Sequence, residues 1–352
     1  MNILRNLSKR ASLVLAIFCL GLMLISSRAN ALDRVRDRNG VTSGKITKMS
    51  ALSVAITRGG IETKKPVEDI VSITFDDEPD DLTPARRAAG SGRYQSALER
   101  LGKIDTSSVQ RKEIQQEIAF LACLCEGQLA LSGQGSLDQV ISKTTSFLKS
   151  NGKSYRVPQA IELLGTLMLA KQDYNGARAQ FTKLGKAPAP YFKARSALLT
   201  GRTLQTEGKH REAISSFDSA LSAAKDNVAA KSQQLEATLL RSVSQAALGQ
   251  LDASTATIKE IIKQAEPEDA NLMAQAYNAL GDCYLQAENP KAAKLAFLHV
   301  DLLFSSATTE HARALYELSK LWDQLGQSSR ARDAKKRLKE AYPGSRLSLI
   351  HI

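Results

Sequence analysis

The chain has 352 residues, of which 43% are hydrophobic and only 5% are aromatic. This composition favours alanine-rich helix packing over a large β-sandwich, whose strands select aromatic and β-branched residues. The formal net charge is +12, and only four histidines are present, which leaves few groups for acid–base catalysis near neutral pH.

Residues 1–31 are typical of a secretory signal. Arg5, Lys9 and Arg10 form a basic start, residues 11–25 are apolar, and the Ala-Asn-Ala of residues 29–31 is a small-x-small cleavage site. We expect cleavage after Ala31 and a periplasmic or secreted mature chain. The alternative is an uncleaved segment that anchors the protein in the inner membrane. No later stretch is apolar enough to span a bilayer.

Three cysteines follow this segment, namely Cys123, Cys125 and Cys283. Cys123 and Cys125 are two residues apart, so on a helix they point to different faces. We interpret them as small core residues. A disulfide between one of them and Cys283 stays open, since export would permit it.

Residues 32–76 show the period-two alternation of strands that have one buried face. Leu52, Val54 and Ile56, for example, alternate with small or polar residues, and Gly59-Gly60 follows as a turn signal. The predicted strands cover residues 32–38, 41–48, 52–57, 61–66 and 71–75. Five short strands cannot leave long edges exposed, so we expect closure into a small β-barrel.

The segment from Gly44 to Phe75 resembles an SH3-like or Sm-like barrel. Sm-like relatives bind RNA, and bacterial SH3-like relatives often bind cell-wall peptide. Residues 32–84 hold eight Lys and Arg against ten Asp and Glu, and this acidic balance disfavours phosphate binding, so no nucleic-acid partner is expected. The resemblance implies either a structural cap on the first helical repeat or a dedicated ligand site.

Residues 77–81 are acidic and contain Pro79, so they are predicted to form a solvated linker. Residues 82–343 then follow a helical pattern, and residues 344–352 form a tail. At three places a glycine is followed by alanine twelve residues later and by phenylalanine sixteen residues later. The triplets are Gly165/Ala177/Phe181, Gly201/Ala213/Phe217 and Gly281/Ala293/Phe297.

These triplets resemble tetratricopeptide repeats, in which two antiparallel helices cross at small residues and a large side chain fills the next interface. Glycine inside a helix costs about 1 kcal/mol relative to alanine, and close approach of two helix axes supplies a reason for it. Weaker copies flank the three triplets. The predicted fold is mainly α, a right-handed α-solenoid of about six or seven hairpins behind a small five-stranded barrel.

In this family, ligands lie in a concave groove lined by the first helix of each hairpin. Arg195 and Arg202 are seven residues apart, so they share a helix face and could hold an acidic peptide or a carboxylate. The alternative is an ordinary solvated groove. The candidate groove residues are Glu162, Thr166, Arg195, Leu198, Arg202, Gln205, Gln275, Asn278 and Asp282.

The last predicted helix is strongly basic, with seven basic and two acidic residues between positions 330 and 346. Lys335, Lys336 and Arg337 are candidate contacts to an anionic surface such as cell-wall polymer or lipid headgroups. The alternative is a solvated helix face. Lys335 stands where the repeat pattern has an aromatic residue, which predicts that this hairpin caps the array.

No nucleophile–base pair, metal-ligand set or phosphate-binding glycine loop is recognisable. We therefore expect no catalytic, cofactor-binding or metal-binding residues, and not an enzyme. The favoured hypothesis is an extracytoplasmic scaffold that mediates protein–protein interaction in the assembly or maintenance of a cell-envelope complex. The alternative is a cell-wall or anionic-polymer binding protein that acts through the β unit or the basic C-terminal helix. The oligomeric state stays open.

Overall fold

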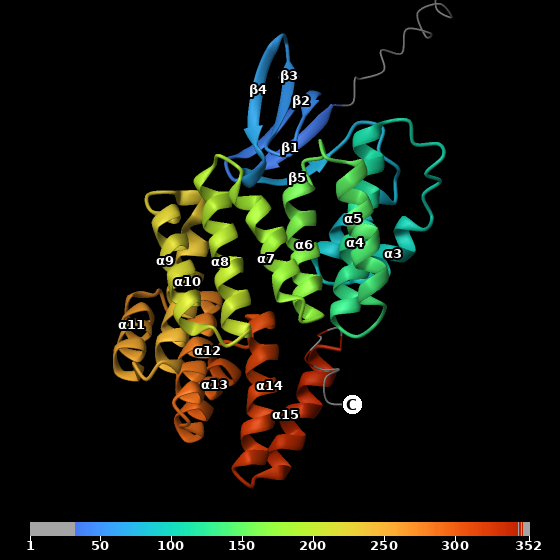
Figure 1. The fold of residues 1–352 in the computed structure, drawn as a ribbon. Coiled ribbons are helices and arrows are strands. Elements are labelled where there is room, and N and C mark those ends of the chain that lie inside the picture. The colour runs from blue at the N-terminus through green and yellow to red at the C-terminus, as the bar shows by residue number, and fades with distance from the viewer. Residues whose placement is uncertain (1–31, 344, 346, 348–352) are drawn as a thin grey trace, which may run out of the picture.

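A computed structural model describes residues 32–343, 345 and 347. It places a small antiparallel sheet at one end of a long array of paired helices (Figure 1). None of the helices in these residues combines the length and the apolar character needed to cross a membrane. The predicted secretory signal, and most of the predicted tail, lie outside the described residues.

The predicted five strands are confirmed. They are β1 (Asp33–Asp37), β2 (Gly40–Met49), β3 (Ser53–Arg58), β4 (Ile61–Pro66) and β5 (Ile70–Thr74), with a short helix η1 (Val67–Asp69) before the last. All neighbouring strands are antiparallel, in the order β4-β3-β2-β1-β5. Val35, Val54, Ile56 and Ile73 are buried on one face of the sheet, as the alternation requires.

The predicted closure into a barrel is wrong. β4 and β5 are the outer strands of the sheet, and no ladder joins them. The first half of β2, Gly40 to Gly44, pairs with β1, and its second half pairs with β3 from Lys45 onward, with an irregularity between Ile46 and Lys48 of the kind that bends a strand. The helices take the place of closure: Val67, between β4 and β5, packs on a cluster that includes Phe181 and Phe192.

Seven helical hairpins make up the described part of the array, in agreement with the predicted number. Their first helices are α2 (Leu82–Gly90), α4 (Lys112–Leu131), α6 (Val157–Ala170), α8 (Pro190–Thr206), α10 (Lys231–Ala247), α12 (Ala270–Gln286) and α14 (Thr308–Gln324). Their second helices are α3 (Tyr94–Leu101), α5 (Leu137–Ser150), α7 (Tyr174–Gly185), α9 (His210–Ala224), α11 (Leu251–Gln264), α13 (Pro290–Leu303) and α15 (Ser328–Ala341). A short helix η2 (Val228–Ala230) precedes α10.

Several helices begin at residues whose side chains cap free backbone N–H groups. Ser136 accepts a hydrogen bond from Gln139 N, Asp173 from Gly176 N and Asn289 from Ala292 N. Such caps satisfy N–H groups that have no partner inside the helix and are each worth about 1 kcal/mol. The hairpin boundaries are thus fixed locally by the sequence.

The glycine–phenylalanine register places each aromatic ring against the glycine of its own hairpin. A Cβ added at Gly165 would lie 2.4 Å from Phe181 Cε1, and the matching distance from Gly201 to Phe217 is 2.5 Å. Phe181 also packs on Phe192 of the following hairpin. The phenylalanine therefore fills both the crossing within its hairpin and the interface to the next one, and the sequence-based expectation had included only the second contact.

Replacing Gly165 by alanine is expected to lower the free energy of unfolding by up to about 2 kcal/mol. The added methyl group gains about 1 kcal/mol of helix propensity, but overpacking against the Phe181 ring costs about 1–3 kcal/mol. Urea unfolding followed by circular dichroism measures the difference. The double variant Gly165→Ala/Phe181→Leu should lose less than the two single losses together, because the shorter side chain makes room for the methyl group.

Gly90 provides the matched control for this experiment. It also lies in a helix, α2, but a Cβ added there meets no atom within 4 Å. Gly90→Ala should leave stability unchanged or raise it slightly. Equal losses at the two glycines would contradict the close-packing explanation.

The first helices pack directly on one another along the array, as between α8 and α10, α10 and α12, and α12 and α14. In the described residues, successive second helices have no comparable contact. Helices that lie closer together belong to the inside of a bend, so the first helices form the concave layer of the array and the second helices the convex layer.

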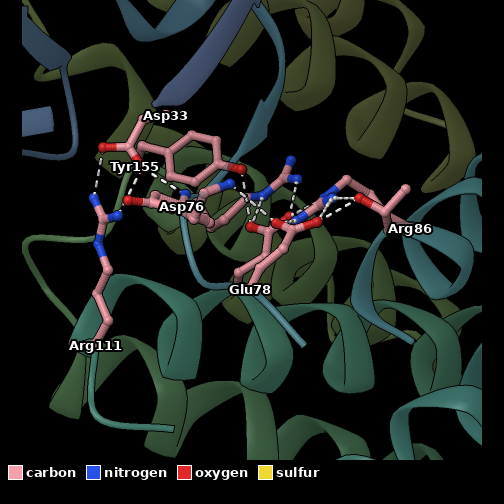
Figure 2. A network of polar contacts seen from close by, with 10 residues as sticks. Asp33, Asp76, Glu78, Arg86, Arg111 and Tyr155 are labelled. Atoms are coloured by element: carbon pink, nitrogen blue, oxygen red, sulfur yellow. Dashed lines mark hydrogen bonds and ion pairs between the residues drawn. The ribbon is translucent and has the colours of Figure 1, made fainter. Parts of the chain in front are cut away.

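An ion pair at the beginning of strand β1 attaches the sheet to the helical array (Figure 2). Arg111, just before α4, donates two hydrogen bonds to Asp33 of β1, at 2.6 Å and 2.9 Å. Burial alone would raise the pKa of Asp33, but Arg111 and the N–H groups of Ile46 and Asp76 outweigh it and hold that pKa below its ordinary value. Asp33 therefore stays ionised and holds the first strand on the array.

A second cluster, centred on the fully buried Glu117, lies beside it (Figure 2). Glu117 of α4 accepts hydrogen bonds from Arg86 Nε at 2.9 Å, from Arg156 Nη2 at 2.7 Å and from the Tyr155 hydroxyl at 2.8 Å. Glu78 also binds Arg86, at 3.1 Å. The sequence predicts a solvated linker for residues 77–81, but Glu78 packs against the helices. Its carboxylate and that of Glu117 together neutralise the largely buried guanidinium of Arg86.

The three cysteines after the predicted signal are buried, and none of them forms a disulfide. Burial raises the pKa of Cys125 to about 11 and that of Cys283 to about 12. Both thiols are therefore protonated at neutral pH and act as small core side chains.

Candidate functional site

The concave layer carries a row of charges that crosses three first helices. Arg195 of α8 binds Glu162 of α6 at 2.8 Å, and on its other side it lies 3.7 Å from Glu236 of α10. Arg202, two turns further along α8, binds the same Glu236 at 2.8 Å. We call Glu162, Arg195, Glu236 and Arg202 the charge row.

The charge row is partly shielded from solvent. Burial alone would lower the pKa of Arg195, but the adjacent Glu162 and Glu236 carboxylates outweigh it and raise that pKa. The side chain of Arg202 is the most accessible member, with 50% exposed. The row thus presents positive and negative groups side by side, with Arg202 as the member that a ligand reaches most directly.

Polar contacts continue the pattern into the later hairpins. Gln205 Nε2 donates to Ser244 Oγ at 2.8 Å, and Asn278 Nδ2 donates to Glu310 Oε2 at 2.7 Å. Asp282 of α12 pairs with Arg313 of α14. Each contact links one first helix to the next, so these residues hold the curvature of the array as well as lining its concave face.

The structure brings most of the predicted groove residues onto this face, with two departures. Leu198 is 0% exposed and packs in the core, so it cannot contact a ligand in this conformation. Asn278 is equally buried, although its side chain reaches Glu310. Thr166 donates to the carbonyl oxygen of Glu162 within α6, and Gln275 lies half-buried on α12.

Sequence reasoning missed the residues that complete the row. Glu236 lies 34 residues after Arg202, and Arg313 lies 31 residues after Asp282. Both separations are close to one repeat, so pairing opposite charges one repeat apart would have found them. The two arginines predicted to hold an acidic ligand already have carboxylate partners from neighbouring helices.

The basic C-terminal cluster is also largely paired. Lys335 lies 3.1 Å from Asp323, Lys336 lies 3.9 Å from Glu340, and Arg337 donates to Asp301 Oδ2 at 2.9 Å. Asp301 is buried, so Arg337 is committed to a structural contact. Lys336 remains the most accessible of the three, and its partner is equally exposed.

His311 has a carboxylate partner in the fold. His311 Nε2 lies 2.8 Å from Asp301 Oδ1, and its Nδ1 lies 2.6 Å from the Tyr342 hydroxyl. Asp301 belongs to the preceding helix and lies ten residues upstream of His311. A search for carboxylates four residues away on the same helix does not find such a partner. Because Arg337 binds the same carboxylate, this cluster joins α13, α14 and the end of α15.

A cleft of about 860 Å³ lies between the sheet and the segment that leads into α4. Asp33 and Arg111 are among its lining residues and are bound to each other there. In the described residues, no group of three or more His, Cys, Asp or Glu side chains is arranged to hold a metal ion.

No family model and no curated protein matches the sequence. Among solved structures, the chain is similar to a Rap protein complexed with Competence and Sporulation Factor, with a TM-score of 0.50 and 12% identity over 75% of this chain and 76% of that one. It is also similar to NprR in complex with its cognate peptide NprX, with a TM-score of 0.48 and 16% identity over 78% and 82% of the two chains.

A tetratricopeptide repeat protein from Parabacteroides merdae has a TM-score of 0.48 and 16% identity, covering 76% of this chain and 96% of that one. At these identities the likeness concerns the fold alone. It agrees with an array of stacked helical repeats, which the hairpins and their glycine–phenylalanine contacts define.

Proposed function

We propose that this protein is a non-enzymatic scaffold that binds a protein or peptide partner on the concave layer of its first helices. The observation that carries the proposal is the charge row, which runs across α6, α8 and α10 and leaves the Arg202 guanidinium half exposed. The phenylalanines of the repeat register are buried between helices. The concave face is therefore free of large apolar side chains from the register and offers mainly polar contacts.

An extended peptide suits such a face. Its backbone amides and side chains can exchange hydrogen bonds with both signs of charge along the row, and extended concave surfaces are the characteristic binding surfaces of solenoids. The similar Rap protein was crystallised with Competence and Sporulation Factor. That neighbour supports the choice of a peptide or protein partner at the level of the fold.

The proposed setting is the cell envelope, outside the cytoplasm. Support comes from residues 1–31, which have the basic start, apolar run and small-x-small site of a secretory signal. In that setting, a scaffold that engages other proteins would take part in assembling or maintaining an envelope complex. Fusion of residues 1–40 to a reporter that is active only after export tests the location separately from the binding.

The binding proposal is tested by a photo-crosslinking residue placed at Arg202 in living cells. A specific partner should be captured there, and not from Lys259, an exposed position on the second helix α11. Arg202→Gln should weaken binding of the captured partner by about ten-fold, as expected for an arginine at the centre of an interface. Lys259→Gln should leave it unchanged. Capture of the same proteins from both positions would refute the proposed face.

A further inference from the structure

The β sheet separates its charges between its two sides. Its acidic side chains are largely engaged in ion pairs: Asp33 with Arg111, Asp37 with Lys65 at 2.7 Å, and Asp69 with Arg38 at 3.9 Å. The acidic balance of residues 32–84 therefore says little about the surface of the sheet. The exposed charge depends on which side chains remain unpaired.

Five basic side chains share the outer side of the sheet. On β1, Arg34 lies opposite Ser43 and Arg36 lies opposite Val41. Lys45 follows at the next outward position of β2.

The other two basic residues are placed by their pairing with β3. Lys48 of β2 and Lys64 of β4 both lie opposite Ala55, which places them on the same side as each other. Lys45 and Glu62 lie opposite Thr57, so Glu62 is the acidic residue of this face.

These five residues form what we call the outer basic face: Arg34, Arg36, Lys45, Lys48 and Lys64. All five are exposed, and within residues 32–343 none of them has an ion pair or a side-chain hydrogen bond. Asp76 and Asp77 border the face only beside Lys45, in the cleft between the sheet and α4. The face is open to a partner, because all five side chains are exposed and the strands that carry Lys45, Lys48 and Lys64 project away from the helices (Figure 1).

An aliphatic side chain accompanies the basic ones. Val41, next to Arg36 on the same face, is 51% exposed. Ile61, at the turn between β3 and β4, is 73% exposed but lies on the other side of the sheet, one position beyond Glu62. Positive charge combined with an exposed aliphatic side chain suits the boundary between lipid headgroups and acyl chains. A soluble anionic polymer would leave Val41 in water.

Nucleic acid fits this face less well. Single-stranded nucleic acid is bound by stacking bases on exposed aromatic rings. The sheet unit of residues 32–76 has one aromatic residue, Phe75, and it is buried with 3% exposed. Base stacking therefore has no platform on the outer basic face.

The position of the sheet in the chain agrees with a membrane partner. The apolar run of residues 11–25 precedes β1 by only seven residues, 26–32. Seven residues span at most about 25 Å when fully extended. If that run enters a bilayer, the sheet is held within this distance of the headgroups.

We propose that the outer basic face docks on the surface of a bilayer that contains anionic lipid. The contact is electrostatic, through single positive charges above the headgroups, with Val41 at the acyl boundary. It lies on a different surface from the charge row of the helices. The scaffold can then bind its protein partner while it rests on a membrane.

The test compares the full chain with two triple variants in a vesicle sedimentation assay. Arg34→Gln/Arg36→Gln/Lys64→Gln removes three charges from the outer basic face. Arg211→Gln/Lys259→Gln/Lys263→Gln removes three exposed charges from α9 and α11 that have no ion pair within residues 32–343, and it changes the net charge equally. Residues 1–31 are identical in all three proteins, so a difference between them arises in the folded part.

The unchanged protein should bind vesicles of phosphatidylglycerol and phosphatidylcholine more tightly than vesicles of phosphatidylcholine alone, and salt should weaken the preference. Each Lys or Arg near an anionic surface contributes about five-fold, so the sheet variant should bind about a hundred-fold more weakly. The control variant should bind like the unchanged protein. Far-UV circular dichroism checks that each variant is folded. If the sheet variant is not, the single variant Arg36→Gln, with an expected loss of about five-fold, replaces it. If the control is not, the single variant Lys259→Gln replaces it.

Three results would overturn the proposal. One is equal binding to the two kinds of vesicle, and another is an equal loss in both triple variants, which would reflect net charge alone. The third is displacement of the protein from anionic vesicles by single-stranded RNA at lower concentration than by soluble anionic lipid, which would assign the face to nucleic acid.

Discussion

Replacement of Glu117 by glutamine is expected to destabilise the protein by about 3–5 kcal/mol. The Glu117 side chain is 0% exposed and is the shared partner of Arg86 and Arg156. Glutamine has nearly the same size, but it removes the negative charge and turns an NH₂ group towards two buried guanidinium donors. Urea unfolding followed by circular dichroism measures the loss.

Glu126→Gln is the matched control for this variant. Glu126 is on the same helix, α4, and pairs with Lys143 at 2.6 Å, but both side chains are more than a third exposed. Pairs of that kind contribute about 0–1 kcal/mol. If the two variants lost the same stability, burial would not be what makes the Glu117 cluster important.

The same carboxylate gives the stability of the protein a defined dependence on pH. Burial alone would raise the pKa of Glu117, but Arg156 and Arg86 outweigh it and lower the pKa from its ordinary value of 4.5 to about 2. A depressed pKa means that the stabilisation is complete above pH 4.5 and is lost as the pH falls towards 2. A difference of this size corresponds to about 3 kcal/mol.

The pH dependence is measured by urea unfolding at a series of pH values between neutral and 2. The unchanged protein should lose stability through the acid range more steeply than Glu117→Gln, since the variant has no proton to take up at this position. The two free energies of unfolding should approach each other near pH 2. Parallel pH profiles would mean that Glu117 does not titrate with a depressed pKa.

The repeats could be predicted from the sequence because their cause is local. Gly165 and Phe181 belong to one hairpin, and the fixed spacing of sixteen residues brings them together in any copy of the motif. The strands were predictable for a similar reason, since alternation defines a buried face within one strand. The open edge between β4 and β5 was not, because Val67 packs on helices more than a hundred residues further along the chain.

The charged contacts were harder to predict than the helices. The helical period placed Arg195 and Arg202 on one face of their helix, and the resemblance to the repeat family implied that this face lines the groove. Neither showed that Glu236 lies between the two arginines. Such a partner depends on the rotation and offset of the next hairpin, which side-chain packing decides. In the same way, the acidic balance of residues 32–84 concealed the outer basic face, because four of the ten acidic residues follow the sheet unit of residues 32–76 and Asp33 pairs with a residue outside this segment.

Phe217 is the second residue at which a large effect is expected. Its side chain is 0% exposed, lies against Gly201, and belongs to a core cluster shared by α8, α9 and α10. Phe217→Ala should lower the free energy of unfolding by about 3–5 kcal/mol, because it loses buried apolar contacts and leaves a cavity. Phe217→Leu retains more of the volume and should lose clearly less.

The location of the loss is as informative as its size. In a repeat array, each hairpin is stabilised mainly by its own contacts and by those with its neighbours. Hydrogen exchange in Phe217→Ala should therefore accelerate in α8, α9 and α10 and remain slow in α4, where the Glu117 cluster holds the chain. In Glu117→Gln, hydrogen exchange should instead accelerate in α4 and remain slow in α8, α9 and α10. Uniform acceleration in both variants would show instead that the sheet and all seven described hairpins unfold as one unit. The contacts of Glu117 and Phe217 would then stabilise the whole array rather than only the hairpins around them.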